Sequence, residues 1–268
     1  AAKVNIKRIP DEIMLNSEVF LIECDRGKKV KIKKINIIGN ESVKAGKLRR
    51  AMKDTKQMAI WRIFKSSKFT ESAYSRDKIA MLNKFNAVGL RDAKIVKDSV
   101  YMVNDKHLMI DITIDEGEKY YFGDITWIGN TKFRSTYLDT ILGIKPGDIY
   151  NKQLLEERLR MSQDGRDISS LYMDRGYLFF DVTPVETDFT DNRISYEIRI
   201  REGKEARVGT IFIRGNTKTN DHVILREIRT RPGDLFSRND IIRTQRELAQ
   251  LGYFNEQAFQ VNQMPDPQ

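Results

Sequence analysis

The rarest reactive side chains in the sequence are two histidines and one cysteine, and they are the first candidates for metal binding or nucleophilic chemistry. His107 precedes an alternating apolar segment, and His222 stands at the start of a predicted helix. Neither has the neighbouring Cys or His residues of a zinc site. The single Cys24 cannot form an internal disulfide. We therefore predict surface histidines and no metal site, and we interpret Cys24 as a small core residue, since it aligns with Ile114 and Ile200 of the later repeats.

Phosphate binding and acid–base catalysis are also poorly supported. Residues 143–147 (GIKPG) contain the glycines of a phosphate loop but no following Lys and Ser or Thr, and they end a predicted helix instead of opening one. Acidic residues are frequent, yet no pair recurs at a spacing suited to shared general acid–base work. The sequence therefore predicts a protein that is not an enzyme and that needs no cofactor.

The most unusual segment is residues 57–70, QMAIWRIFKSSKFT, in which aromatic and basic residues are interleaved. Between residues 41 and 68, nine Lys and Arg stand against two Asp and Glu, which accounts for most of the net charge of +9. One interpretation is that the segment folds back over its own domain. The other is a docking surface for a partner or an anionic membrane. Its candidate residues are Trp61, Arg62, Phe64 and Lys65.

These candidates belong to a chain that repeats itself. The segment KKINIIGN at residues 33–40 returns as GDITWIGN at 123–130 and as GTIFIRGN at 209–216. The glycine of each GN pair follows the glycine of a charged turn by 12 residues, and the GN pairs are 90 and 86 residues apart. A period of this size is a small domain. The sequence therefore predicts an array of similar domains.

Within a repeat, the first strand ends at the GN pair and two helices follow. The second helix is expected to start after an aromatic residue and a capping residue. These pairs are Tyr74-Ser75, Tyr150-Asn151 and Phe236-Ser237. In the second repeat this helix is ten residues longer and contains Asp164-Gly165, so we predict a break there.

Two strands complete each repeat, giving the order β-α-α-β-β. The second strand of the repeats is predicted at residues 93–98, 179–186 and 258–261. The third and last strand of a repeat is predicted from alternating apolar and polar residues that precede a Gly turn. Pro184 cannot donate a hydrogen bond to a neighbouring strand, so its strand is expected at the edge of the sheet.

Four segments follow from this pattern. Residues 1–29 are the closing hairpin of a preceding repeat, and residues 30–117 form a repeat with the insertion at 57–70. Residues 118–203 form the second repeat, and residues 204–268 form a third without its last strand. No apolar run reaches the roughly 18 residues of a membrane helix, and the start has no signal-peptide pattern.

A basic nucleic-acid-binding module is an alternative, because the βααβ order is also that of KH domains. Such domains clamp nucleic acid with a G-x-x-G loop between the helices. The corresponding segments here read GIKPGD and RTRPGD, and the basic excess is confined to one repeat. We therefore expect no nucleic acid as a partner.

The order and spacing of I-x-G-N, K/R-P-G-D, G-Y and E-G across the chain resemble the POTRA (polypeptide-transport-associated) domains of the BamA family of outer-membrane β-barrel assembly factors. The first repeat departs from this pattern, since it lacks K/R-P-G-D and carries the insertion at 57–70. The resemblance implies an α+β fold, a tandem array of domains that each have a three-stranded mixed sheet with two helices on one face.

The resemblance also implies a function at the periplasmic face of the bacterial outer membrane. Its expected partners are unfolded outer-membrane proteins, accessory outer-membrane lipoproteins and periplasmic chaperones, with membrane attachment through a C-terminal barrel outside this sequence. Binding is expected partly by strand addition at a sheet edge. The POTRA region of a two-partner secretion translocator is the alternative within the family. The candidate edge residues are Ala93, Ile95, Lys97, Phe179, Asp181 and Thr183.

Overall fold

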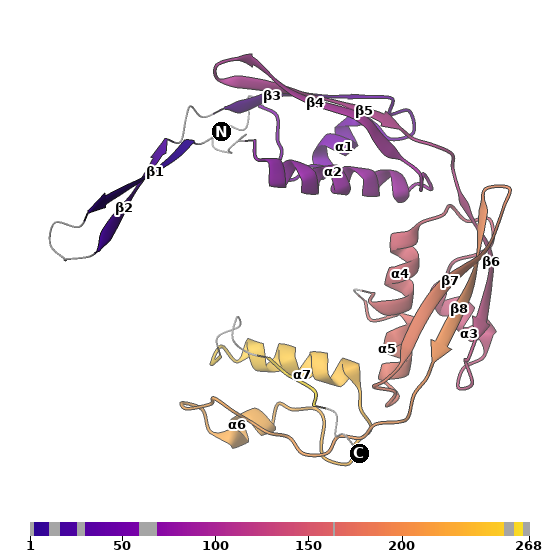
Figure 1. Cartoon of the computed structure of the whole chain (residues 1–268). Coiled ribbons are helices and arrows are strands. Elements are labelled where there is room, and N and C mark those ends of the chain that lie inside the picture. Colours follow the sequence, from indigo (N-terminus) through magenta and orange to yellow (C-terminus); the bar gives the residue numbers. More distant parts are fainter. Residues whose placement is uncertain are drawn as a thin grey trace. The chain divides into compact units, whose positions relative to one another are not determined.

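The structure of the protein is a computed structural model that describes residues 3–10, 17–25, 30–58, 69–162, 164–254 and 260–264 (Figure 1). The chain divides into two compact units. One unit contains Ala1–Phe85 and Asp92–Gly117, and the other contains Asn86–Arg91 and Glu118–Gln268.

The first unit contains a mixed sheet in the order β3–β5–β4. β3 (Lys31–Ile38) runs parallel to β5 (His107–Asp115), and β4 (Lys94–Asn104) runs antiparallel to it. Alternate residues of β5, from Leu108 to Ile114, are buried. This is the pattern expected of a strand that buries one face.

Two helices of the first unit, α1 (Ala45–Ala51) and α2 (Glu71–Asn86), lie on one face of this sheet (Figure 1). They bury Leu48, Met81 and Phe85. The prediction that α2 starts after Ser75 is wrong, because the backbone N–H of Tyr74 already donates to the carbonyl of Thr70 at 3.0 Å. The first repeat lacks the Pro-Gly pair that precedes the second helix in the other repeats, and its second helix, α2, begins about one turn before the predicted start.

A separate hairpin in the first unit joins β1 (Lys3–Pro10) and β2 (Glu18–Asp25) as an antiparallel pair. The repeat aligns Phe20 and Ile22 with buried residues of β5, but here they are 55% and 60% exposed. The expected buried face is therefore not observed, because a two-stranded ribbon without a packed layer buries little apolar surface.

The second unit contains a sheet with the same topology. β6 (Tyr121–Ile128) runs parallel to the central β8 (Arg193–Arg201), and β7 (Asp181–Thr190) lies antiparallel at the other edge. The edge position predicted from Pro184 is confirmed. Both sheets are mixed and three-stranded, as the fold prediction requires.

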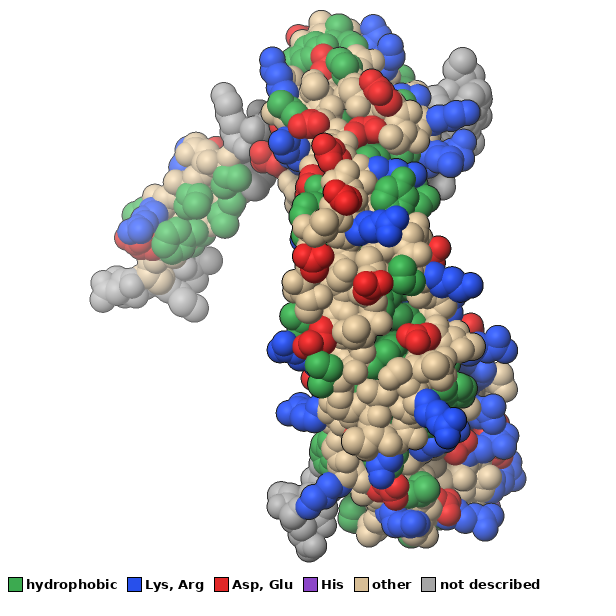
Figure 2. Space-filling view, turned by 90° about the vertical axis from the view of Figure 1, so that its right-hand side faces the viewer, with side chains coloured by type: hydrophobic (Ala, Val, Ile, Leu, Met, Phe, Trp, Pro, Cys, Tyr) green, Lys and Arg blue, Asp and Glu red, His purple; other side chains and the backbone are tan. Residues whose placement is uncertain are grey.

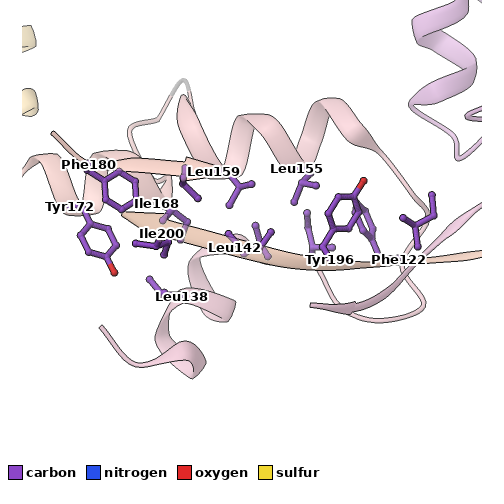
Figure 3. Close-up of a cluster of buried hydrophobic side chains, with 14 of the residues drawn as sticks. Phe122, Leu138, Leu142, Leu155, Leu159, Ile168, Tyr172, Phe180, Tyr196 and Ile200 are labelled. Carbon is purple, nitrogen blue, oxygen red and sulfur yellow. The ribbon is translucent and has the colours of Figure 1, made fainter. Parts of the chain in front are cut away.

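Three helices cover this second sheet. α3 (Ser135–Leu142) is followed by α4 (Lys152–Arg160) and α5 (Ile168–Met173), so the predicted break near Asp164-Gly165 is confirmed. The core is formed by side chains of these helices and of the strands, which meet between the two layers (Figure 3). It includes Phe122, Leu138, Leu142, Leu155, Leu159, Ile168, Tyr172, Phe180, Tyr196 and Ile200.

Capping side chains start the second helix in two repeats as predicted. Asn151 accepts a hydrogen bond from the backbone N–H of Leu154 at 3.1 Å. Ser237 accepts one from Asp240 at 3.2 Å at the start of α7 (Arg238–Gln250). Each cap satisfies a backbone donor that the helix itself leaves without a partner.

The third repeat contains α6 (Asp221–Leu225) and α7 but lacks a strand ladder in the described residues, which hold a single bridge between Arg207 and Leu235. The strand predicted at 209–216 is therefore not observed. In the other repeats this strand pairs with the last strand of the same repeat, and the described residues of the third repeat contain no such strand. Of the strand predicted at 258–261, residues 258 and 259 lie outside the described part, and 260–261 are not in a strand.

The GN turn has the same construction in all three repeats. Asn40, Asn130 and Asn216 each donate from the side-chain amide to a backbone carbonyl three residues later, at 2.8–3.0 Å. The preceding glycines have φ between 82° and 87°, in the left-handed region that favours glycine. The repeated motif is therefore a fixed turn that leads into the first helix of each repeat.

Candidate partner-binding edges

The outer edge of β3 is hydrogen-bonded by the protein's own chain. The backbone N–H of Met58 donates to the carbonyl oxygen of Ile32 at 2.8 Å. The N–H of Ile35 donates to the side-chain oxygen of Gln57 at 3.2 Å. Because its peptide groups are occupied here, this part of β3 is closed to strand addition.

The start of the outer edge of β6 is occupied in the same way. The N–H of Gly147 donates to the carbonyl of Phe122 at 2.7 Å, and the N–H of Phe122 donates to the carbonyl of Asp148 at 2.8 Å. A bridge between Tyr121 and Ile149 continues this contact. Among the described residues, the edge strands β4 and β7 show no such backbone hydrogen bonds along their outer edges.

β4 contains two of the three edge residues predicted in the first unit. Ile95 lies opposite Ile114 and is half-buried, while Lys97 lies opposite Thr113 and is exposed. Ala93 is half-buried and precedes the strand by one residue. The strand continues to Asn104, six residues beyond the predicted end.

β7 contains two of the edge residues predicted in the second unit. Asp181 is half-buried and lies 3.9 Å from Arg160, and Thr183 is exposed. Phe179 precedes the strand and is 50% exposed beside Gly203. The two predicted sets thus lie on edge strands of different units.

Charged side chains on both edge strands are paired within their own units. Lys78 of α2 donates to Asp98 at 2.8 Å, and this hydrogen bond holds the pKa of Asp98 below its ordinary value. On β7, Arg91 donates to Glu186 at 3.0 Å. Charges on edge strands protect a sheet from unspecific pairing.

The far half of β4 is different, since apolar side chains are exposed on both of its faces. Val100 and Met102 lie opposite buried residues of β5 but are 41% and 52% exposed. Tyr101 and Val103, on the other face, are each 43% exposed. The prediction missed these residues, although their apolar run stands directly before the polar Asn104 turn.

The insertion residues Trp61, Arg62, Phe64 and Lys65 lie outside the described part of the chain, so neither interpretation of the insertion is tested. The side chain of Cys24 also lies outside it. His107 contacts Asn104 through Nδ1 at 3.0 Å, and His222 is exposed on α6. Among the described residues, no cluster of His, Cys, Asp and Glu could hold a metal ion.

On the face in Figure 2, Asp and Glu side chains stand among the Lys and Arg side chains, and hydrophobic side chains form small separate groups. Within the part of the chain that the structure describes, none of the helices is long and apolar enough to cross a membrane.

The family model described as POTRA, surface antigen variable number repeat, matches residues 30–117, 120–203 and 206–267. The chain belongs to the POTRA family. The three matched segments each begin shortly before a GN-ending segment, so the repeated turn is a feature of each POTRA repeat. The edge strands β4 and β7 are the second strands of the first two matched repeats.

Two proteins with similar sequences are named as outer membrane protein assembly factors. The chain is 28% identical over 245 residues to a putative outer membrane protein assembly factor of Treponema pallidum, covering 88% of this chain and 28% of that protein. It is 27% identical over 263 residues to the outer membrane protein assembly factor BamA of Neisseria meningitidis, covering 96% and 32%. The chain thus spans about a third or less of the length of these relatives.

A solved structure shows the same fold. The crystal structure of Haemophilus influenzae BamA POTRA3-5 superposes with a TM-score of 0.64 at 21% identity, covering 85% of this chain and 88% of that one. This agreement supports the tandem POTRA architecture.

Proposed function

We propose that this chain is the periplasmic, partner-binding region of an outer-membrane protein assembly factor. Its partners would be unfolded outer-membrane proteins and accessory outer-membrane lipoproteins. The names of the Treponema and Neisseria relatives support this role, since both describe assembly factors and not enzymes. The chain covers only part of each relative, so this activity belongs to the proposal.

The observation that carries the proposal is the difference between the two edges of the first sheet. Residues 57 and 58 occupy part of the outer edge of β3, whereas β4 exposes Val100, Tyr101, Met102 and Val103 at the opposite edge. An exposed apolar edge strand promotes aggregation unless it has a partner. Its presence therefore favours a binding function.

Strand addition suits a receptor for varied partners, because main-chain hydrogen bonds supply affinity for many sequences. The exposed side chains of β4 would then add apolar contacts on both faces of an added strand. On β7, Pro184 lacks an N–H, and Glu186 is already paired with Arg91. We therefore place the main docking edge on β4.

The test is photocrosslinking in cells with the full-length protein. A photoreactive residue replaces Met102 on β4, Thr183 on β7 or, as a control, the exposed Ile38 on β3. We expect adducts with outer-membrane proteins or lipoproteins chiefly from position 102. Equal adducts from positions 102 and 38, or none from 102, would contradict the proposal.

A further inference from the structure

In the part of the first unit that the structure describes, the hairpin of β1 and β2 carries an uncovered apolar face. Ile6 pairs with Ile22, and Val4 and Phe20 each lie two residues away along their strands, on the same face. These four side chains are between 55% and 60% exposed. The face is therefore open to a partner.

The other repeats show what covers a face of this kind. The residues aligned with Phe20 and Ile22 are Ile110 and Ile112 on β5 and Tyr196 and Ile198 on β8, and they are at most 3% exposed. β5 and β8 are central strands, with a parallel first strand on one side, an antiparallel second strand on the other and helices over one face. Among the described residues, β2 is paired with β1 alone. The hairpin is therefore equivalent to the last two strands of a repeat without its first strand and helices.

The described part of the third repeat contains the complementary elements. It has the two helices, α6 and α7, and the segment 209–216 that precedes them and ends at the GN turn. Just before this segment, the N–H of Val208 donates to the carbonyl of Asp234 at 2.8 Å, and the N–H of Gly233 donates to the carbonyl of Val208 at 2.7 Å. Phe122, at the start of β6, has the same two bonds. The segment is thus held on its outer side like β6, but the described residues supply no central strand beside it.

The core of the third repeat is also open where a central strand would lie. Leu142 and Leu155 of the second repeat are 0% and 1% exposed, whereas the aligned Ile228 and Ile241 of the third repeat are half-buried. In the second repeat the end of β8 lies against the glycine of the GN turn, whereas nothing lies within 4 Å of the Cβ position of Gly215. A pair of strands with an apolar face toward the helices fits this space.

We propose that the hairpin of one copy of the chain completes the third repeat of a second copy. β2 would run parallel to residues 209–216 as the central strand, and β1 would form the outer edge. The register between β6 and β8, carried over by the alignment, places Phe20 beside Ile211 and Ile22 beside Ile213. The apolar face of the hairpin then packs on α6 and α7.

The choice of a second copy rests on the match between the two parts. Two strands without helices and two helices without a central strand together give a sheet of the β3–β5–β4 type with its helical layer. The added strands gain main-chain hydrogen bonds, and the hairpin buries apolar surface that a two-stranded ribbon leaves in water. Since each copy has both parts, the contact is head-to-tail and can continue from copy to copy.

The first test compares two double variants of the full chain by sedimentation velocity over a range of concentrations. Ile6→Asp/Ile22→Asp places charges on the apolar face. Ile9→Asp/Leu21→Asp is the matched control, because these residues are 43% and 42% exposed on the opposite face of the same strands. We expect the unchanged chain and the control to associate as the concentration rises, and the apolar-face variant to associate at least about tenfold more weakly. A chain that stays monomeric at all concentrations, or equal weakening by both variants, would overturn the proposal.

The second test distinguishes this contact from two hairpins that pack face to face. The Ile6→Asp/Ile22→Asp variant retains its third repeat, and thermal unfolding should show it folded. An excess of this variant should therefore bind the hairpins of a labelled unchanged chain and shorten the assemblies. A face-to-face pair of hairpins would exclude the variant, so assemblies of unchanged length would count against the proposal.

Crosslinking locates the contact on the full chain. A photoreactive residue at position 22 should form adducts with residues 209–241 of another copy, identified in a mixture of isotopically light and heavy chains. The same photoreactive residue at position 21, on the opposite face of β2, is the control and should form none there. Adducts from position 22 that stay within one chain would show closure in a single copy and would refute the proposal.

Discussion

The carbonyl oxygen of Ile200 occupies the space that a Cβ atom on Gly129 would need. Gly39 and Ile114 have the same relationship in the first repeat. Both glycines also have positive φ. The glycine of the GN motif is therefore required for two reasons, its backbone conformation and the lack of space for a Cβ atom. The turn can only close over the end of the last strand if that residue has no side chain.

We expect Gly129→Ala to be far more destabilising than Gly147→Ala. Gly147 also has a positive φ, 89°, but nothing lies within 4 Å of its Cβ position. Left-handed backbone costs about 1–3 kcal/mol in either variant, and only Gly129→Ala adds the collision with Ile200. Urea unfolding followed by Trp127 fluorescence measures the difference. Equal losses would show that the collision is relieved by movement of the strand.

Asp167 caps α5 and accepts hydrogen bonds from the backbone N–H groups of Ser162 and Ser170. Asp167→Ala should destabilise the second repeat by about 3 kcal/mol, because the helix cap is lost and these N–H groups are left without acceptors. Asn151→Ala is the control, since Asn151 caps α4 through one hydrogen bond and should cost about 1 kcal/mol. Denaturant unfolding compares the two. A smaller loss for Asp167→Ala than for Asn151→Ala would contradict its role at the helix break.

Two buried tyrosines form a series of hydrogen bonds that ends at Glu186. The hydroxyls of Tyr150 and Tyr196 are 3.0 Å apart, and Tyr196 also donates to Glu186 at 3.0 Å. Tyr196→Phe removes both bonds and should lower the free energy of unfolding by about 2 kcal/mol, whereas Tyr150→Phe removes one and should lower it by about 1 kcal/mol. If chemical denaturation showed a larger loss for Tyr150→Phe than for Tyr196→Phe, the hydrogen bonds between Tyr150, Tyr196 and Glu186 would not account for the stability.

The Lys78–Asp98 pair makes the first unit sensitive to acid. The hydrogen bond from Lys78 lowers the pKa of folded Asp98 below its ordinary value of 3.8. Its stabilising effect is therefore complete above that value and is lost as the pH falls through the lowered pKa. Lys78→Met should raise the pKa of Asp98 in an NMR titration and flatten the acid dependence of stability.

Lys84→Met is the control for this titration, because Lys84 is an exposed residue of the same helix, whereas Asp98 forms its ion pair with Lys78. It should leave the pKa of Asp98 unchanged. An equal rise in both variants would assign the shift to the general charge of α2 and not to the Lys78 contact.

The sequence was sufficient to predict the features that depend on local chemistry. The GN turns, the caps at Asn151 and Ser237, the break near Asp164-Gly165 and the edge position of Pro184 all follow from backbone preferences of single residues. These motifs recur in the same order in successive repeats, and this recurrence predicted the tandem α+β fold.

Features that depend on a partner segment could not be predicted in this way. β4 extends to Asn104 because β5 continues opposite it, and the strand expected at 209–216 is absent where no partner strand is described. The hydrogen bond from the N–H of Met58 to the carbonyl of Ile32 joins residues distant in sequence. Alternation and charge along the chain contain no signal for such contacts.

The closed edges of β3 and β6 have a consequence for folding. The repeats have similar first strands, so a partly folded chain can pair the first strand of one repeat with the last strand of another. Residues 57–58 and 147–148 hydrogen-bond the first strand of their own repeat. A first strand that moved into the sheet of another repeat without these residues would forfeit those bonds, which favours pairing within one repeat.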